Sequence, residues 1–255
     1  MKVNVLYLGK LYCKRDYLIQ CGDQNAMIQS PISAILIRHP KLGNILYDTG
    51  NSPYYSREYP KSVLETYPVE EFISIEEALK LHGLTAEDID MLILSHLHFD
   101  HAGGLRYFAG TKALHNVLVS ESELKHAYHH VITGKKSAYI KPLFDVEGIR
   151  YQTWKDELEL ADDISLFAQN SHTPGCAGML LKLLEQGNMI VTSDTIYTKD
   201  NFELELPPGG SINATTEEFY TNLARIKKMQ AQWNAGLIYG HDFEQISRLS
   251  RCTLQ

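Results

Sequence analysis

Residues 95–104, which read SHLHFDHAGG, constrain this chain more than any other part of the sequence. They place four side chains that can bind metal, His96, His98, Asp100 and His101, within six residues. An apolar run that is typical of a buried strand comes directly before them. Imidazole and carboxylate ligands without thiolates suit zinc, iron, manganese or cobalt in a hydrolytic site. The segment therefore predicts a metal centre in a loop at the end of a strand.

The composition limits the classes of protein to which the chain can belong. Its 255 residues are 44% hydrophobic, so we expect a large core that needs no disulfides. A net charge of -7 and the lack of a dense Lys/Arg run disfavour nucleic acid as a partner. No apolar run approaches the roughly 18 residues that cross a bilayer, and no signal peptide is evident, so no membrane partner is expected. The cysteines form no CxxC pair, which favours reduced thiols and a cytoplasmic location. They are Cys13, Cys21, Cys176 and Cys252.

Strands and helices alternate along the chain. The apolar patterns predict strands over residues 3–8, 34–37, 44–50, 91–94, 117–119, 164–167, 179–184, 189–192 and 237–239. Helices are expected over 74–82, from 104, after Ser120 and over 217–230, where Thr215 or Thr216 would cap the helix. No repeat or long linker divides the chain. We therefore expect one domain, residues 1–255, in which two sheets pack between helices.

Three later segments carry further ligands. His172 follows the strand predicted over 164–167, Asp194 follows that over 189–192, and His241 follows the last strand. The carboxyl ends of strands in open α/β sheets collect functional groups. We therefore expect these side chains to join the first four at one edge.

The pattern His-x-His-x-Asp-His, followed by His, Asp and His, resembles the metallo-β-lactamase superfamily from about residue 3 to 244. The resemblance implies an α/β fold of the αββα sandwich type, with two mixed sheets between outer helices. It also implies two divalent metal ions, with zinc expected and iron, cobalt or manganese as alternatives. One ion would be held by His96, His98 and His172, the other by Asp100, His101 and His241, with Asp194 bridging them. Asp48, in the Asp-Thr-Gly turn, matches a residue that supports the ligands.

Two cysteine and histidine features leave alternatives open. Many relatives carry a second His shortly after the ligand His172, and here Cys176 stands at that place. Cys176 is either close to the metal or a small buried residue. His126, His129 and His130 are spaced to share a helix face, as a third metal site or as a solvated face.

The residues that flank the ligands narrow the function. The SHLHFDHAGG loop, the segment DTIYTKDNF that begins at Asp194, and GHD around His241 resemble N-acyl-homoserine-lactone lactonases. The resemblance implies an enzyme that opens the lactone ring by attack of a metal-bridging hydroxide. Tyr197 would donate a hydrogen bond to the oxyanion, and Asp100 would pass a proton to the leaving alkoxide. The implied partner is a small lactone, and the protein would be a monomer or homodimer.

Three segments are candidates for the substrate wall. The aromatic loop after Asp48, with Tyr54, Tyr55, Tyr59, Tyr67 and Phe72, either lines an acyl-chain groove or simply packs. We rank residues 11–19 below that loop. Residues 207–210, of sequence PPGG, resemble a family segment that borders the substrate.

Two other functions compete with the lactonase hypothesis. A hydrolase of another lactone, an ester, a thioester or a cyclic amide would use the same dinuclear site. A non-catalytic binding module would keep the fold and lose the chemistry, although all seven ligand positions are filled.

Overall fold

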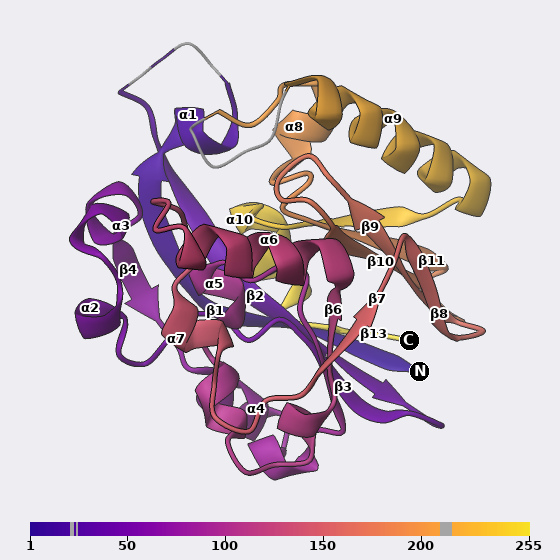
Figure 1. The fold of residues 1–255 in the computed structure, drawn as a ribbon. Coiled ribbons are helices and arrows are strands. Elements are labelled where there is room, and N and C mark those ends of the chain that lie inside the picture. The colour runs from indigo at the N-terminus through magenta and orange to yellow at the C-terminus, as the bar shows by residue number, and fades with distance from the viewer. Residues whose placement is uncertain (21–22, 24, 210–215) are drawn as a thin grey trace.

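The computed structural model describes residues 1–20, 23, 25–209 and 216–255. Two mixed sheets pack face to face, and helices cover their outer sides (Figure 1). The chain therefore has the αββα architecture that the sequence predicts. Cys21, Gly210 and Thr215, which entered the sequence analysis, lie outside the described residues.

The larger sheet has eight strands. Strand β4 (Val69–Phe72) pairs only with β1, and β3, β5, β6 and β7 run parallel to one another. The other pairs are antiparallel. The order is β13 (Thr253–Leu254), β1 (Lys2–Lys14), β2 (Met27–His39), β3 (Gly43–Tyr47), β5 (Met91–Ile93), β6 (Val117–Ser120) and β7 (Tyr151–Trp154).

The smaller sheet has five strands. Only β11 and β12 are parallel, whereas β8 to β11 form antiparallel pairs. The order is β12 (Gly236–Tyr239), β11 (Asn188–Ser193), β10 (Cys176–Lys182), β9 (Ile164–Gln169) and β8 (Glu157–Ala161). Both sheets are thus mixed, as expected.

Three clusters of buried apolar residues pack the four layers of the fold against one another. One, with Val5, Ile37 and Met179, fills the space between the sheets. A second packs helices on the outer face of the larger sheet, and a third packs α9 on the outer face of the smaller one. The helices are α1 (Arg15–Leu18), α2 (Tyr55–Glu58), α3 (Lys61–Thr66), α4 (Ile75–Leu81), α5 (Phe99–Ala102), α6 (Glu121–Ile132), α7 (Lys141–Phe144), α8 (Lys199–Glu203), α9 (Thr216–Trp233) and α10 (Phe243–Leu249).

The strand directions bring the candidate ligands to one edge. Because β3 and β5 are parallel, the segments that follow them leave the larger sheet at the same end. In the smaller sheet, β9, β11 and β12 all point the same way, since β10 is antiparallel to both β9 and β11. The carboxyl ends of five strands therefore surround one site.

The local signals for helices are partly confirmed. Ser74 and Glu77 form the expected capping box of α4, and the Ser120 hydroxyl accepts the Glu123 N–H at the start of α6. The helix predicted from residue 104 is present as a short 3-10 helix with Gly104 as its N-cap. A short α-helix, α5, begins earlier at Phe99, and residues Leu105–Phe108 form only a 3-10 turn. Gly103 and Gly104 lie between these two elements. Their backbones contact residues 49–52 so closely that a Cβ atom on either glycine would clash.

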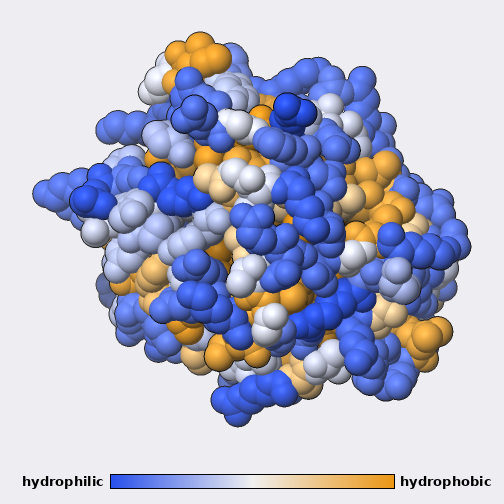
Figure 2. Space-filling model, turned by 90° about the horizontal axis from the view of Figure 1, so that it is seen from below, coloured by the Kyte–Doolittle hydropathy of each residue, from blue (hydrophilic) through white to orange (hydrophobic). Residues whose placement is uncertain are grey.

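One face of the molecule is mainly hydrophilic. In the face shown in Figure 2, hydrophilic residues predominate and apolar residues lie in separate groups. None of the helices in the described residues is long and apolar enough to cross a membrane.

The capping box gives a test of the local stability. Replacing Ser74 with Ala leaves the N–H of Glu77 without its acceptor, so the free energy of unfolding should fall by about 1 kcal/mol. Urea denaturation at fixed metal concentration measures the change. Ser62→Ala, at an exposed position within α3, is the control and should change little. An unchanged Ser74→Ala midpoint would contradict the stabilising role of the cap.

Candidate metal centre

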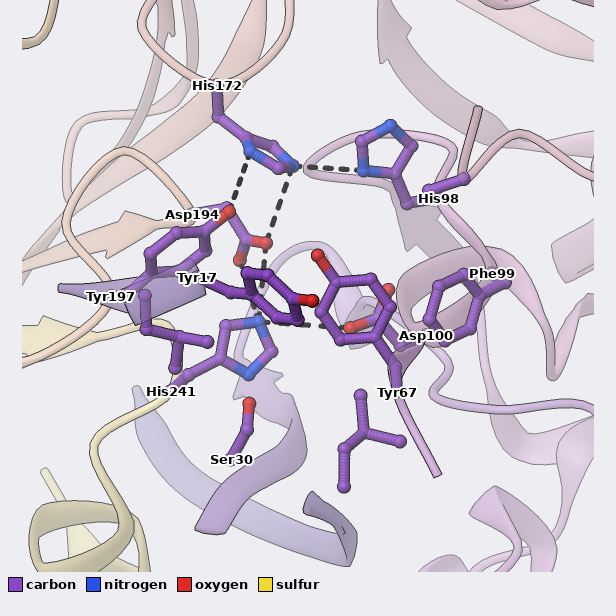
Figure 3. Close-up of a pocket in the computed structure, with 13 residues that line it drawn as sticks. Tyr17, Ser30, Tyr67, His98, Phe99, Asp100, His172, Asp194, Tyr197 and His241 are labelled. Atoms are coloured by element: carbon purple, nitrogen blue, oxygen red, sulfur yellow. Dashed lines mark hydrogen bonds and ion pairs between the residues drawn. The ribbon is translucent and has the colours of Figure 1, made fainter. Parts of the chain in front are cut away.

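The structure brings together all seven side chains that the sequence selected as metal ligands. They follow strands from both sheets and converge at the edge where the strand ends meet. Figure 3 shows His98, Asp100, His172, Asp194 and His241 around the cavity there. Each of the seven is at least nine-tenths buried, which protects the site from bulk water. From the larger sheet come His96, His98, Asp100 and His101, and from the smaller sheet come His172, Asp194 and His241.

His96, His98 and His172 form the first ligand set. His172 Nε2 lies 2.9 Å from His98 Nδ1 and 3.1 Å from His96 Nε2. Nitrogens that bind one zinc ion tetrahedrally at about 2.0–2.1 Å lie about 3.3 Å apart. The three imidazoles are therefore close to the spacing that a single ion requires.

Asp100, His101 and His241 form the second set. The Asp100 carboxylate lies 3.7 Å from His101 Nε2 and 3.8 Å from His241 Nε2. His241 is oriented by its other ring nitrogen, Nδ1, which lies 2.8 Å from the Pro31 carbonyl oxygen. A protonated Nδ1 that donates there leaves Nε2 directed at the centre.

Asp194 lies between the two sets. Its Oδ1 is 3.4 Å from His101 Nε2 and 3.2 Å from His241 Nε2. Its Oδ2 is 3.5 Å from His172 Nε2 and 3.7 Å from His96 Nε2. Asp194 Oδ2 also lies 3.2 Å from His241 Nε2, so the carboxylate contacts both sets, as a bridging carboxylate does.

The charges in the site depend on this carboxylate. Burial and the neighbouring imidazoles lower the pKa of His96 and His98 well below its usual value, so both are neutral and can offer lone pairs. Burial opposes protonation of His101 as well, but the three nearby carboxylates raise its pKa well above the usual value. The pKa of Asp194 is lowered, because the surrounding histidines outweigh its burial.

The residues fit a pair of divalent cations. His101 Nε2 and Asp194 Oδ1 are buried 3.4 Å apart, and neither atom makes a well-aligned hydrogen bond in the described part of the chain. Such atoms are costly unless a ligand satisfies them. Nitrogen and oxygen ligands suit zinc and also iron, cobalt or manganese, so the donor set does not select one metal.

Asp48 supports His101 of the second set directly and His96 of the first set through Ser95. Its Oδ2 lies 2.8 Å from His101 Nδ1, and its two oxygens accept hydrogen bonds from the Ser95 N–H and hydroxyl. The Ser95 hydroxyl in turn lies 3.0 Å from His96 Nδ1. Asp48 has a φ of 62°, a left-handed conformation that few residues other than glycine adopt. The strained backbone is therefore found where the sequence placed a supporting residue.

Tyr197 reaches the centre from the segment after Asp194. Its hydroxyl oxygen is 2.9 Å from His172 Nδ1, so the phenol sits beside the first set (Figure 3). Burial and the Asp194 charge raise the pKa of Tyr197 well above its usual value. The phenol therefore stays protonated at neutral pH and is able to donate a hydrogen bond.

Two alternatives left by the sequence are decided by geometry. Cys176 is buried, its Sγ contacts the Ser193 hydroxyl at 3.6 Å, and burial raises the pKa of its thiol. It belongs to none of the ligand groups among the described residues, so it is a buried residue near the site and not a ligand, and the Asp194 charge also raises its pKa. His126 and His130 stack at 4.4 Å, but neither they nor His129 belong to a ligand group in the part of the chain described.

A small cavity opens onto the candidate ligands His98, Asp100, His172, Asp194 and His241. The ranking of its walls that the sequence suggested is wrong. Leu11, Tyr17 and Leu18 line it, whereas the aromatic loop contributes only Tyr67. Tyr55 packs against Tyr59 and Phe72, whereas Tyr54 is exposed and its ring lies against Arg57 and Arg106.

Several residues of the cavity wall are not predicted by the sequence. Ser30, Phe99 and Ala138 also line the cavity. Ser30 arrives there because β2 pairs it with Leu11, and Phe99 because α5 begins inside the ligand motif. Residues 207–209 instead pack against the segment around α1, where Gln20 N–H donates to the Pro207 carbonyl.

One family model and several known proteins resemble this chain. Residues 28–241 match the model described as the metallo-beta-lactamase superfamily. An N-acyl homoserine lactonase of a Bacillus species is 31% identical over 67% of this chain, which spans 63% of that relative's length. Another, from Bacillus cereus, is 28% identical over 96% of both chains. A solved N-acyl homoserine lactone hydrolase, with the product N-hexanoyl-L-homoserine at its catalytic metal centre, has a TM-score of 0.83. It is 24% identical and the match covers 97% of this chain and 95% of that one, which shows the shared fold.

The support from Asp48 gives a testable prediction. Asp48→Asn removes the charge that holds His101, so metal affinity should fall about 10- to 100-fold. Chelator competition measures the affinity. Asp162→Asn, at an exposed position, should leave it unchanged. Equal affinities for the two variants would contradict the role given to Asp48.

Proposed function

Because the chain belongs to the metallo-beta-lactamase superfamily, we propose that it hydrolyses the lactone ring of N-acyl homoserine lactones. Curated relatives with this name support the proposal. The observation that carries it is the position of Tyr197, whose hydroxyl is 2.9 Å from His172 Nδ1. Tyr197 lines the same cavity as Asp100 and Asp194, so a donor, an acid and the metal ligands all face one bound molecule.

The residues have complementary roles in this proposal. Two divalent ions, zinc in the first instance, would lower the pKa of water toward about 7 and supply a nucleophile at neutral pH. Tyr197 donates a hydrogen bond to the carbonyl oxygen as negative charge develops on it. Asp100 accepts the proton that the attacking nucleophile loses and passes it to the departing ring oxygen, which completes the open hydroxy acid.

The cavity walls match an amphipathic substrate. Leu11, Leu18 and Phe99 line the same cavity as the polar ligands, so an acyl chain can pack on them while the ring meets the ligands. We also propose that residues 1–255 act as one domain, since the cluster between the sheets includes both Val3 and Leu254. A cytoplasmic location is proposed because the described cysteines, Cys13, Cys176 and Cys252, are free.

A substrate panel tests the proposal. Proton release by the metal-loaded protein is followed with acyl-homoserine lactones of short to long chain, simple γ- and δ-lactones, and S-lactoylglutathione. Asp194→Asn is the blank. Fast hydrolysis of the homoserine lactones, lost in the blank, is the expected result. Activity confined to other lactones or the thioester would overturn the substrate and keep the dinuclear mechanism, and silence across the panel would overturn both.

Tyr197 is tested by removing only its hydroxyl. Tyr197→Phe should lower kcat about 10- to 1000-fold, because the oxyanion loses its donor, while metal content stays the same. Steady-state kinetics and metal analysis give the two values. Tyr220→Phe, at an exposed position on α9, is the matched control. Wild-type turnover by Tyr197→Phe would remove the assignment.

A further inference from the structure

The start of α6 lies between the two loops that carry the first ligand set. One loop holds His96 and His98, and the other runs from His172 to Gly175. A Cβ atom on Gly175 would lie 2.2 Å from the Ser120 and Ser122 hydroxyl oxygens, so this loop is in close contact with the helix start. Any shift of α6 would therefore move the His172 loop.

Glu123, in the first turn of α6, reaches the other loop. Its side chain is fully buried, and Oε1 accepts the Leu97 N–H at 2.8 Å. Leu97 stands between His96 and His98, so this bond fixes the backbone that carries both ligands. Burying a carboxyl group without partners costs several kcal/mol of folding free energy. An apolar residue at position 123 of α6 would be buried at a lower cost.

Tyr139 provides a second connection. Its hydroxyl donates to Glu123 Oε2 at 3.2 Å, and its ring centroid lies 4.5 Å from that of His98. The backbones of His98 and Tyr139 also form an isolated antiparallel bridge. Glu123 thus restrains the His98 ring through Tyr139 as well as its backbone through Leu97.

We propose that Glu123 is a positioning residue that shapes the first ligand set, His96, His98 and His172, for its metal ion. The second set has its own supports. His101 Nδ1 lies 2.8 Å from Asp48 Oδ2, and His241 Nδ1 lies 2.8 Å from the Pro31 carbonyl. Loss of Glu123 should therefore weaken one ion and spare the other. This inference rests on the metal-binding part of the proposed function and is independent of the lactone substrate.

Metal binding by purified variants tests the inference. Glu123→Ala removes both hydrogen bonds, whereas Glu123→Gln keeps an acceptor for the Leu97 N–H. We expect Glu123→Ala to bind one of two zinc ions about 10- to 100-fold more weakly in chelator competition, and Glu123→Gln to recover most of the affinity. Glu121→Ala is the control and should bind both ions normally, because Glu121 pairs with Lys125 on the same helix and with Lys155, away from the ligand loops.

Cadmium-113 NMR identifies the ion that is lost. Glu123→Ala should lose the resonance that His98→Ala lacks and keep the one that His241→Ala lacks. Loss of both resonances, or unchanged affinity with only a lower melting temperature in excess chelator, would show a general structural brace and overturn the proposal. If Glu123→Ala does not fold, Tyr139→Phe is used for the same test. We expect Tyr139→Phe to lose a smaller part of the same resonance and to keep the other. An unchanged spectrum would contradict the proposal.

The wild-type protein separates this inference from the lactonase proposal. Two bound ions without lactone hydrolysis would remove the substrate assignment and leave the positioning role of Glu123 to be decided by the variants. Failure of the wild-type protein to bind a second ion would overturn both.

Discussion

Burial of seven ionisable side chains in one small volume is the constraint on which this structure depends. Each charged group removed from water costs several kcal/mol unless a partner compensates it. Asp194 provides that compensation for His101 and His241, while His96 and His98 remain neutral. Without the central carboxylate, the imidazoles of both sets would face one another with only Asp48 and Asp100 to offset their protonation.

The sheets meet this constraint by strand direction. Parallel neighbours, β3 with β5 and β11 with β12, deliver their loops to the same edge, and the turns there adopt strained backbones. Asp48 has a φ of 62° and Ser193, next to Asp194, a φ of 48°. Left-handed residues of this kind cost about 1 kcal/mol or more and cluster at functional sites. The rigid sheets beneath them keep this strain in place.

The sequence was sufficient to predict the layers and which ligands come together, because each ligand lies within a few residues of an apolar strand end. It was insufficient for the cavity wall. Leu11 reaches the cavity through pairing with Ser30 across the long β1–β2 hairpin, and no local pattern encodes that register. Glu123 shows a related limit. A Glu three residues after Ser120 reads as part of a helix cap, yet its side chain turns toward Leu97.

The ligands come from both sheets, and this division has a mechanical consequence. Four are attached to the larger sheet and three to the smaller one, so ions held between them would act as cross-links across the apolar interface. The free energy of metal binding then also stabilises the contact between the two sheets. The sandwich would resist sliding of one sheet over the other most strongly at the edge where the reaction takes place, and least at the opposite edge.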